Sequence, residues 1–141
     1  EGGLYFVVLT AKDSEERQSV AFEQISINHF AEGDGSVDGG SSGTVSATVN
    51  PYVETVSIYI NVTGDNGLPI IESDVTVTIN SPTGAVFEQD LLLNNGETQS
   101  LSFSTSEVEM VGGWEILLES NDAASDFTYA YEWYNYYQAS S

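Results

Sequence analysis

The sequence predicts an all-β protein, folded as an antiparallel β-sandwich of about eight strands. Apolar and polar residues alternate along most of the chain, which is typical of strands with one face in a core. Glycine, asparagine, serine and proline cluster between these segments, as the turns of a sandwich do. A length of 141 residues suits one domain, so residues 1–141 are expected to form a single sandwich.

The clearest strand spans residues 55–63, where Val56, Ile58, Ile60 and Val62 share the inward face. Turn residues follow at 64–67, and a second inward row runs from Val75 to Ile79. The later elements are expected in chain order, and they are a turn at 81–84, a strand at 85–93, a hairpin turn at 94–96, and strands that begin near Leu101, Trp114 and Phe127.

The first 43 residues are less regular. Residues 4–9 are apolar on both faces, which predicts either a central strand or a strand within 1–11 that is donated to a neighbouring subunit. Residues 13–18 are charged and predict a loop or one short helical turn. Residues 20–30 are compatible with a strand or a helix, and we favour the strand. Residues 31–43, rich in glycine and serine, are interpreted as a flexible acidic loop.

Four segments carry a resemblance to a known kind of domain. They are Val75-Thr-Val-Thr-Ile79, Ser81-Pro-Thr-Gly84, Gly113-Trp-Glu-Ile116 and Tyr129-Ala-Tyr131. In this order they resemble secreted jelly-roll domains of the pre-peptidase C-terminal and proprotein-convertase P-domain kind. The resemblance covers about half of the chain and implies a jelly-roll-like architecture, an extracellular setting and a non-catalytic role.

The charge balance excludes several classes of partner. Against 22 acidic residues stand one lysine and one arginine, so the net charge is -20. Nucleic acids and anionic membrane surfaces are bound through clustered cations, which this chain lacks. No run is apolar enough to insert into a membrane. The acidity favours either a halophilic, for example archaeal, protein adapted to high salt or a surface that gathers divalent cations.

A calcium site is predicted within residues 32–39. Asp34, Ser36 and Asp38 precede Gly39 with the spacing that begins an oxygen-rich calcium loop, and Glu32 could add a further ligand. The alternative is a solvated acidic segment, which so acidic a chain produces readily. Ca²⁺ is the only cofactor that the sequence suggests.

The sequence offers no constellation typical of an enzyme. His29 is the only histidine, and no nucleophile motif accompanies it. The carboxylate pairs Glu107/Glu109 and Glu115/Glu119 are expected on the polar sides of strands, as solvated charges. We therefore expect a non-catalytic protein.

The C-terminal strand is aromatic on both faces. Phe127, Tyr129, Tyr131 and Trp133 form one row that is expected in the core, although such rings can also stack on sugars. Tyr134 and Tyr136 alternate to the other face and Tyr137 ends the run. We expect these last three tyrosines, together with Leu4, Tyr5, Phe6, Val7, Val8 and Leu9, to contact another subunit. For the tyrosines, cover by the rest of the same domain is the alternative.

Asn61-Val62-Thr63 is a glycosylation sequon, which favours a glycoprotein outside the cell. The leading hypothesis is a structural subunit of an extracellular filament, pilus-like thread or surface layer that polymerises with itself by strand addition, by donor-strand complementation for example. One alternative is a monomeric, calcium-dependent carbohydrate-binding or adhesion module. Another is the ectodomain of a pilin- or archaellum-associated protein, and either could meet a glycan or another cell-surface partner.

Overall fold

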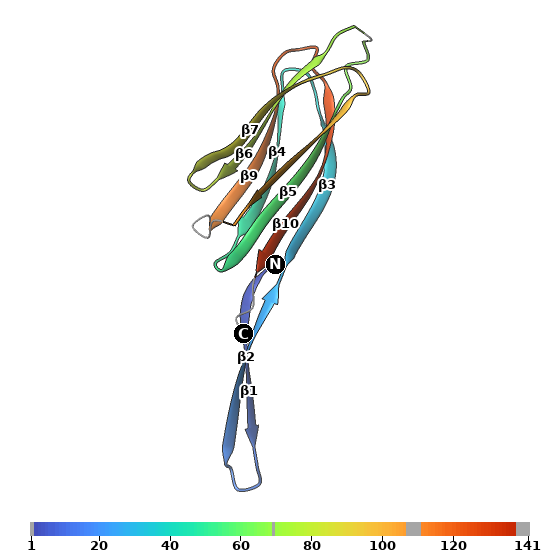
Figure 1. Cartoon of the computed structure of the whole chain (residues 1–141). Coiled ribbons are helices and arrows are strands. Elements are labelled where there is room, and N and C mark those ends of the chain that lie inside the picture. Colours follow the sequence, from blue (N-terminus) through green and yellow to red (C-terminus); the bar gives the residue numbers. More distant parts are fainter. Residues whose placement is uncertain (1, 69, 107–110, 138–141) are drawn as a thin grey trace.

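The computed structural model describes residues 2–68, 70–106 and 111–137, and every regular element in these ranges is a strand (Figure 1). The strands are β1 (Gly3–Lys12), β2 (Gln18–Ile27), β3 (His29–Val37), β4 (Ser42–Val49), β5 (Val53–Gly64), β6 (Ser73–Ser81), β7 (Gly84–Leu93), β8 (Thr98–Thr105), β9 (Gly112–Ser120) and β10 (Phe127–Tyr137).

Eight of these strands form the predicted sandwich. One sheet has the order β3-β10-β5-β8 and the other has the order β4-β9-β6-β7, with antiparallel pairing throughout. The remaining two strands, β1 and β2, pair only with each other and extend away from the sandwich (Figure 1). The fold class predicted from the sequence is confirmed.

The strand order is that of a jelly roll. The pairs β6–β7, β5–β8, β4–β9 and β3–β10 nest inside one another, like the rungs of one long hairpin. Successive pairs fall in alternate sheets, so the hairpin is wrapped around a common core. Four of the eight sandwich strands have a neighbour on both sides, and β3, β8, β4 and β7 are the edge strands.

The core lies between the two sheets and consists of the inward residues that the period-two pattern marks. Val56, Ile58, Ile60 and Val62 are each at most 2% exposed, and Trp114 and Trp133 are equally covered. Buried side chains of this size stabilise a fold by about 1.5–3 kcal/mol each. The remaining members of the core are Val37, Val49, Val53, Val75, Val77, Ile79, Leu91, Leu93, Ile116, Leu118, Phe127 and Tyr137.

The prediction of a hairpin at Asn94–Gly96 is wrong, although the turn itself exists. β7 and β8 lie in different sheets, so the turn crosses the edge of the sandwich. The Gly96 amide donates to the Gly64 carbonyl (2.8 Å) and the Gly64 amide to the Glu97 carbonyl (3.0 Å). These bonds join the turn to the end of β5, so the direction of the turn depends on a partner 32 residues earlier in the sequence, Gly64.

The prediction of a flexible loop at 31–43 is also wrong, because β3 continues to Val37 and β4 begins at Ser42. Gly33 and Gly35 face Tyr131 and Tyr129 across the β3–β10 pair. A Cβ atom on Gly33 would lie 2.9 Å from the Tyr131 hydroxyl, and one on Gly35 would lie 2.6 Å from the Tyr129 hydroxyl. The glycines therefore make room for tyrosine rings that cover β3, an arrangement that stabilises glycine in strands.

The first strand is neither central nor buried. β1 pairs with β2 over ten residues and turns at 13–17, so we call residues 3–27 the arm. The strand expected at 20–30 is confirmed as β2 and the start of β3. The expectation that residues 4–9 are buried on both sides is wrong for the single chain, because the arm contacts the sandwich only at its base.

A substitution at Gly64 tests the contact between the end of β5 and the turn that crosses between the sheets. In Gly64→Ala, the new Cβ would lie 2.5 Å from the Asn94 carbonyl oxygen, so backbone must move, and we expect a loss of about 1–3 kcal/mol in the free energy of unfolding. Gly113→Ala is the control, since no heavy atom lies within 4 Å of its Cβ. Urea unfolding measures both, and equal stabilities would contradict the packing described.

Candidate functional site

The arm presents apolar side chains on both of its faces. Residues directly opposite each other in a hairpin point to the same face, and the pairing joins Thr10 with Val20 and Tyr5 with Ile25. The first face thus contains Phe6, Val8 and Val20, which are 68%, 55% and 48% exposed. The second face contains Tyr5, Ile25 and Ile27, which are 41% to 47% exposed.

This exposure sets the arm apart from an ordinary hairpin. A two-stranded hairpin usually packs one face on a core, and alone it is marginally stable in water. Here neither face has a core beneath it, and contiguous exposed apolar surface of this kind marks interaction sites. The arm is therefore a candidate contact element.

The base of the arm is fixed to the sandwich by polar contacts. The Tyr137 amide donates to Asn28 Oδ1 (2.9 Å), at the single residue between β2 and β3. Asn50 Nδ2 donates to the Gly2 carbonyl (2.6 Å), and the Asn50 amide donates to the Tyr137 hydroxyl (2.9 Å). A Cβ on Gly2 would clash with His29 and with the Tyr137 ring. These contacts hold the arm in line with β3.

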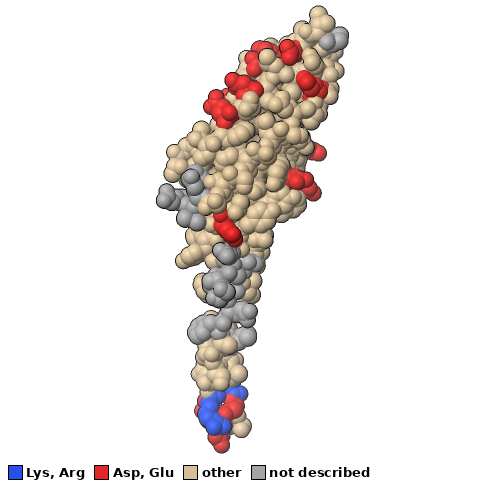
Figure 2. All heavy atoms as spheres, in the orientation of Figure 1, with Lys and Arg blue, Asp and Glu red and all other residues tan. Residues whose placement is uncertain are grey.

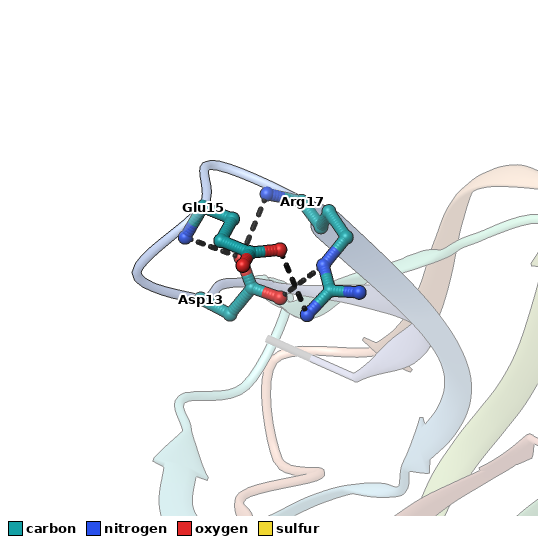
Figure 3. A network of polar contacts seen from close by, with 3 residues as sticks. All are labelled: Asp13, Glu15 and Arg17. Carbon is teal, nitrogen blue, oxygen red and sulfur yellow. Dashed lines mark hydrogen bonds and ion pairs between the residues drawn. The ribbon is translucent and has the colours of Figure 1, made fainter.

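The turn at the tip is organised by one carboxylate (Figure 3). Asp13 Oδ1 accepts bonds from the amides of Glu15 and Arg17, both at 2.9 Å, and Oδ2 accepts from Arg17 Nε at 2.6 Å. Arg17 also lies 3.4 Å from a Glu15 carboxylate oxygen. The prediction of a loop or helical turn at 13–18 is confirmed as a hairpin loop, with Gln18 already in β2.

The two cations of the chain gather at one end of the molecule, beside acidic residues (Figure 2). Lys12 and Arg17 lie at the tip of the arm together with Asp13, Glu15 and Glu16, whereas residues 28–141 contain 17 acidic residues and no lysine or arginine. The ion pairs among the described residues all involve Arg17, so Lys12 is in none of them. Within the described part of the chain, the tip thus offers one exposed ammonium group that is in no ion pair.

A second candidate surface is the outer face of the β3-β10-β5-β8 sheet. Phe30, Tyr59, Tyr134 and Tyr136 form a cluster there, which we call the aromatic patch. Tyr134 lies at its centre, with ring centroids 4.7 Å from Phe30, 6.1 Å from Tyr59 and 5.8 Å from Tyr136, on which it stacks. Phe30, Tyr59 and Tyr136 remain 50%, 48% and 39% exposed.

Carboxylates border the aromatic patch. Glu32 lies directly opposite Glu132, and Asp34 lies one row further along β3. With Tyr59 and Asn61 they line a groove of about 630 Å³. Tyr134 donates a hydrogen bond to Glu132 (3.1 Å), and desolvation together with this bond raises the pKa of Tyr134 above its ordinary value. The phenol is therefore neutral and acts as a donor.

The predicted subunit contacts divide between these surfaces. Tyr5, Phe6 and Val8 are exposed on the arm, and Leu4 and Val7 are half-buried, whereas the Leu9 side chain is outside the described part. Tyr134 and Tyr136 face outward as expected. Tyr137 is 3% exposed and belongs to the core, so its predicted subunit contact is wrong. Tyr137 is the last residue of β10, and its ring packs inward, next to Gly2 at the base of the arm.

Three of the four predicted calcium ligands lie along one strand rather than around a loop. Glu32, Asp34 and Ser36 follow one another on the outer face of β3, and Asp38 comes just after the strand. Among the described residues, no three carboxylate or imidazole groups come together in a way that could hold a metal ion. Calcium binding stays a prediction.

Most of the other residues singled out from the sequence are in the described part of the chain, where they lie on strands. His29 begins β3 and is half-buried, opposite Asn135. Asn61 is exposed on β5, and its amide oxygen accepts a bond from the Ser100 hydroxyl (2.6 Å). Glu115 and Glu119 are half-buried on β9, whereas Glu107 and Glu109 lie outside the described residues. Phe127 and Trp133 are in the core as predicted.

Sequence reasoning missed Phe30 and Tyr59 as parts of the aromatic patch. Both are outward residues on predicted strands, so alternation alone could have marked them as exposed rings. Their meeting with Tyr134 depends on β10 lying between β3 and β5, and pairing between distant strands cannot be read from periodicity.

Comparisons with known proteins show the fold. No protein-family model matches the chain, and no curated protein matches it in sequence. The mitogen derived from Yersinia pseudotuberculosis aligns with a TM-score of 0.50 and 12% identity over 76% of this chain and 86% of the mitogen. Latent PorU from Porphyromonas gingivalis gives 0.58 and 7% over 79% of this chain but only 13% of PorU.

A protein of Bacillus endospore appendages, which form disulfide-linked pili, aligns with a TM-score of 0.45 and 15% identity, over 79% of this chain and 87% of its own. At such identities the likeness concerns architecture alone. The resemblance to jelly-roll β-sandwich domains is confirmed at that level. In the described ranges, no helix has the length and apolarity needed to cross a membrane.

The tip turn should respond to acid. Hydrogen bonds from the Arg17 and Glu15 amides and the Arg17 side chain hold the pKa of Asp13 below its ordinary value of 3.8, against a smaller opposing effect of desolvation. Because the folded pKa is the lower one, the stabilisation is present above 3.8 and is lost as pH falls through the folded value.

NMR titration of Asp13 measures this pKa, and faster amide exchange at Glu15 and Arg17 should accompany its protonation. Asp13→Ala should cause the same faster exchange at neutral pH, whereas Ser14→Ala, in the same turn, should not. A pKa at or above 3.8 would contradict the turn described.

Proposed function

We propose that the chain is a non-catalytic structural subunit of an extracellular filament, pilus-like thread or surface layer, and that the arm joins one copy to the next. The observation that carries the proposal is the exposure of apolar side chains on both faces of the arm. Covering Phe6 and Val8 alone would contribute a few kcal/mol to association, at about 1.5–3 kcal/mol for each fully buried side chain.

Strand addition supports this contact. Among the described strands, β1 pairs with β2 along one edge and with no strand along the other, and the same holds for β2. An added strand would satisfy the free backbone groups while the apolar side chains fill pockets. Since β1 and β2 are already paired over ten residues, we propose that the arm is inserted as a unit rather than β1 alone.

A copy of the same chain is the partner that the proposal favours. The arm lies at one end of the molecule, so a neighbour would contact it with a different surface (Figure 1). Contacts between unlike surfaces repeat into rings or open filaments. The chain has no cysteine, so such an assembly would be noncovalent within this part of the protein. The acidic composition and the sequon support an extracellular place.

The arm is tested by removing apolar surface without shortening the chain. Phe6→Ser/Val8→Ser should lower the association constant at least about 100-fold, since two buried side chains are lost from the contact. Leu92→Ser is the matched control, because Leu92 is 60% exposed on β7, far from the arm. Sedimentation and negative-stain electron microscopy, with calcium and with a chelator, give the readout.

Unchanged assembly of the double variant would contradict the proposal, as would a wild-type chain that stays monomeric in both conditions. Filaments that form with calcium and disappear in chelator would indicate that calcium also takes part in the contacts between copies.

The aromatic patch favours a second candidate function, carbohydrate binding. Flat tyrosine faces can stack on sugar rings, and the neighbouring Glu32, Asp34 and Asn61 can bond to hydroxyl groups in the same groove. In this second candidate function, the protein is an adhesion module that binds carbohydrate as a monomer.

A glycan array tests the second candidate. Tyr59→Ala/Tyr136→Ala should abolish binding, because two of the three exposed rings of the patch are lost, whereas Tyr52→Ala should retain it. Tyr52 is 69% exposed and lies outside the patch, so it serves as the control. An array with no bound glycan, in calcium and in chelator alike, would contradict carbohydrate binding.

A further inference from the structure

The outer face of the β3-β10-β5-β8 sheet has its aromatic and acidic groups in consecutive rows. The pairing places Phe30 beside Tyr134 in one row, Glu32 beside Glu132 and Tyr59 in the next, and Asp34 beside Ala130 in a third. Alternate residues of a strand lie about 7 Å apart. An apolar region is therefore followed, within about 7–14 Å along β10, by carboxylates.

The first face of the arm has the complementary order. Phe6, Val8, Thr10 and Lys12 point to this face in succession, since they alternate along β1. The strongly exposed Phe6 and Val8 come first and the ammonium group of Lys12 comes last, at the tip. Val20, opposite Thr10, extends the apolar part across the hairpin.

The two spacings agree. Val8 and Lys12 are four residues apart on β1, about 13 Å, and the Tyr134 row and the Asp34 row are also four residues apart on β10. An arm aligned with β10 can thus place Val8 on the patch and Lys12 among the carboxylates. The arm, with ten residues in each strand, spans about 34 Å, close to the length of the eleven-residue β10.

Charge favours a second copy as the occupant. Lys12 is in no ion pair among the described residues, and Glu32, Asp34 and Glu132 are exposed carboxylates that gather in one groove. The arm tip holds the chain's one lysine and one arginine beside Asp13, Glu15 and Glu16, and Arg17 pairs with the first two of these carboxylates. Lys12 is therefore the cation through which the arm can attract the carboxylates of residues 28–141 of another copy.

We propose that the arm of one copy lies along β10 on the outer face of the β3-β10-β5-β8 sheet of the next copy, with Phe6 and Val8 on the aromatic patch and Lys12 between Glu32, Asp34 and Glu132. This inference rests on the proposed function, in which the arm joins copies, and names the surface that receives the arm. β10 already has a strand partner on each side, so this contact is made by side chains and does not use strand addition. It also explains why the sheet face exposes rings that a solvated face would not need.

A charge swap tests the contact in the full chain. Lys12→Glu should weaken self-association at least tenfold, and Glu32→Lys/Glu132→Lys should do the same because Lys12 would then meet like charge. A chain with all three changes should recover most of the loss. Glu88→Lys/Asp90→Lys on β7 is the control, since it alters net charge equally at exposed positions of the other sheet. Sedimentation equilibrium measures each association constant.

The outcomes separate this inference from the function beneath it. Recovery in the triple variant, but not when Lys12→Glu is combined with the β7 control, supports the contact. If the wild type assembles and Phe6→Ser/Val8→Ser blocks assembly, yet Glu32→Lys/Glu132→Lys behaves as the β7 control does, the arm docks elsewhere and only this inference is overturned. A wild-type chain that never associates overturns both, and glycan binding to the aromatic patch would then account for its exposed rings.

Discussion

The structure depends on β10, because this strand places aromatic side chains on both of its faces. Inward, Trp133 is fully covered, and its indole Nε1 donates to Asn135 Oδ1 at 2.8 Å. Asn135 in turn donates to the Thr48 carbonyl (3.3 Å) across the sandwich, so the buried polar groups are satisfied. Outward, Tyr134 and Tyr136 stack on each other. A central position between β3 and β5 is what lets one strand support both faces.

The same strand links the core to the arm. Tyr129 and Tyr131 lie over the glycines of β3 and hold that strand in the sheet, and Tyr137 bonds to Asn28 where β2 becomes β3. The orientation of the arm therefore depends on rings that come more than 90 residues later in the sequence. A contact element that has no core of its own takes its direction from the core of the sandwich.

The sandwich could be predicted from the sequence where burial is local in pattern. The alternation of Val56, Ile58, Ile60 and Val62 predicts β5 by itself, and of the residues between them Tyr59 and Asn61 are exposed, whereas Ser57 is covered. Gly33 and Gly35 could not be interpreted in this way, since glycine signals a loop unless the rings that cover it are known. The prediction of a hairpin at Asn94–Gly96 was wrong for a similar reason. The turn residues predict that the chain reverses, but pairing with β5 decides which sheet β8 joins.

The arm was half predicted. Apolar residues on both faces of 4–9 indicated a need for cover, but the sequence could not show that β2 would supply one edge and leave both faces open. The acidic segment at 32–38 differs, because alternation correctly predicts which of its side chains face outward. The segment was expected to be a loop that turns these side chains toward one ion, but most of it is a strand. Both outcomes follow from strand pairing, which joins residues that the sequence separates.

The near-continuity of β2 and β3 has a mechanical consequence. Only Asn28 separates the two strands, so a pull on the arm travels along the peptide backbone directly into β3. β3 is paired with β10 over nine residues, and a force along the strand loads all of these rungs together in shear rather than opening them one after another. The proposed link between copies would therefore resist tension without any covalent crosslink.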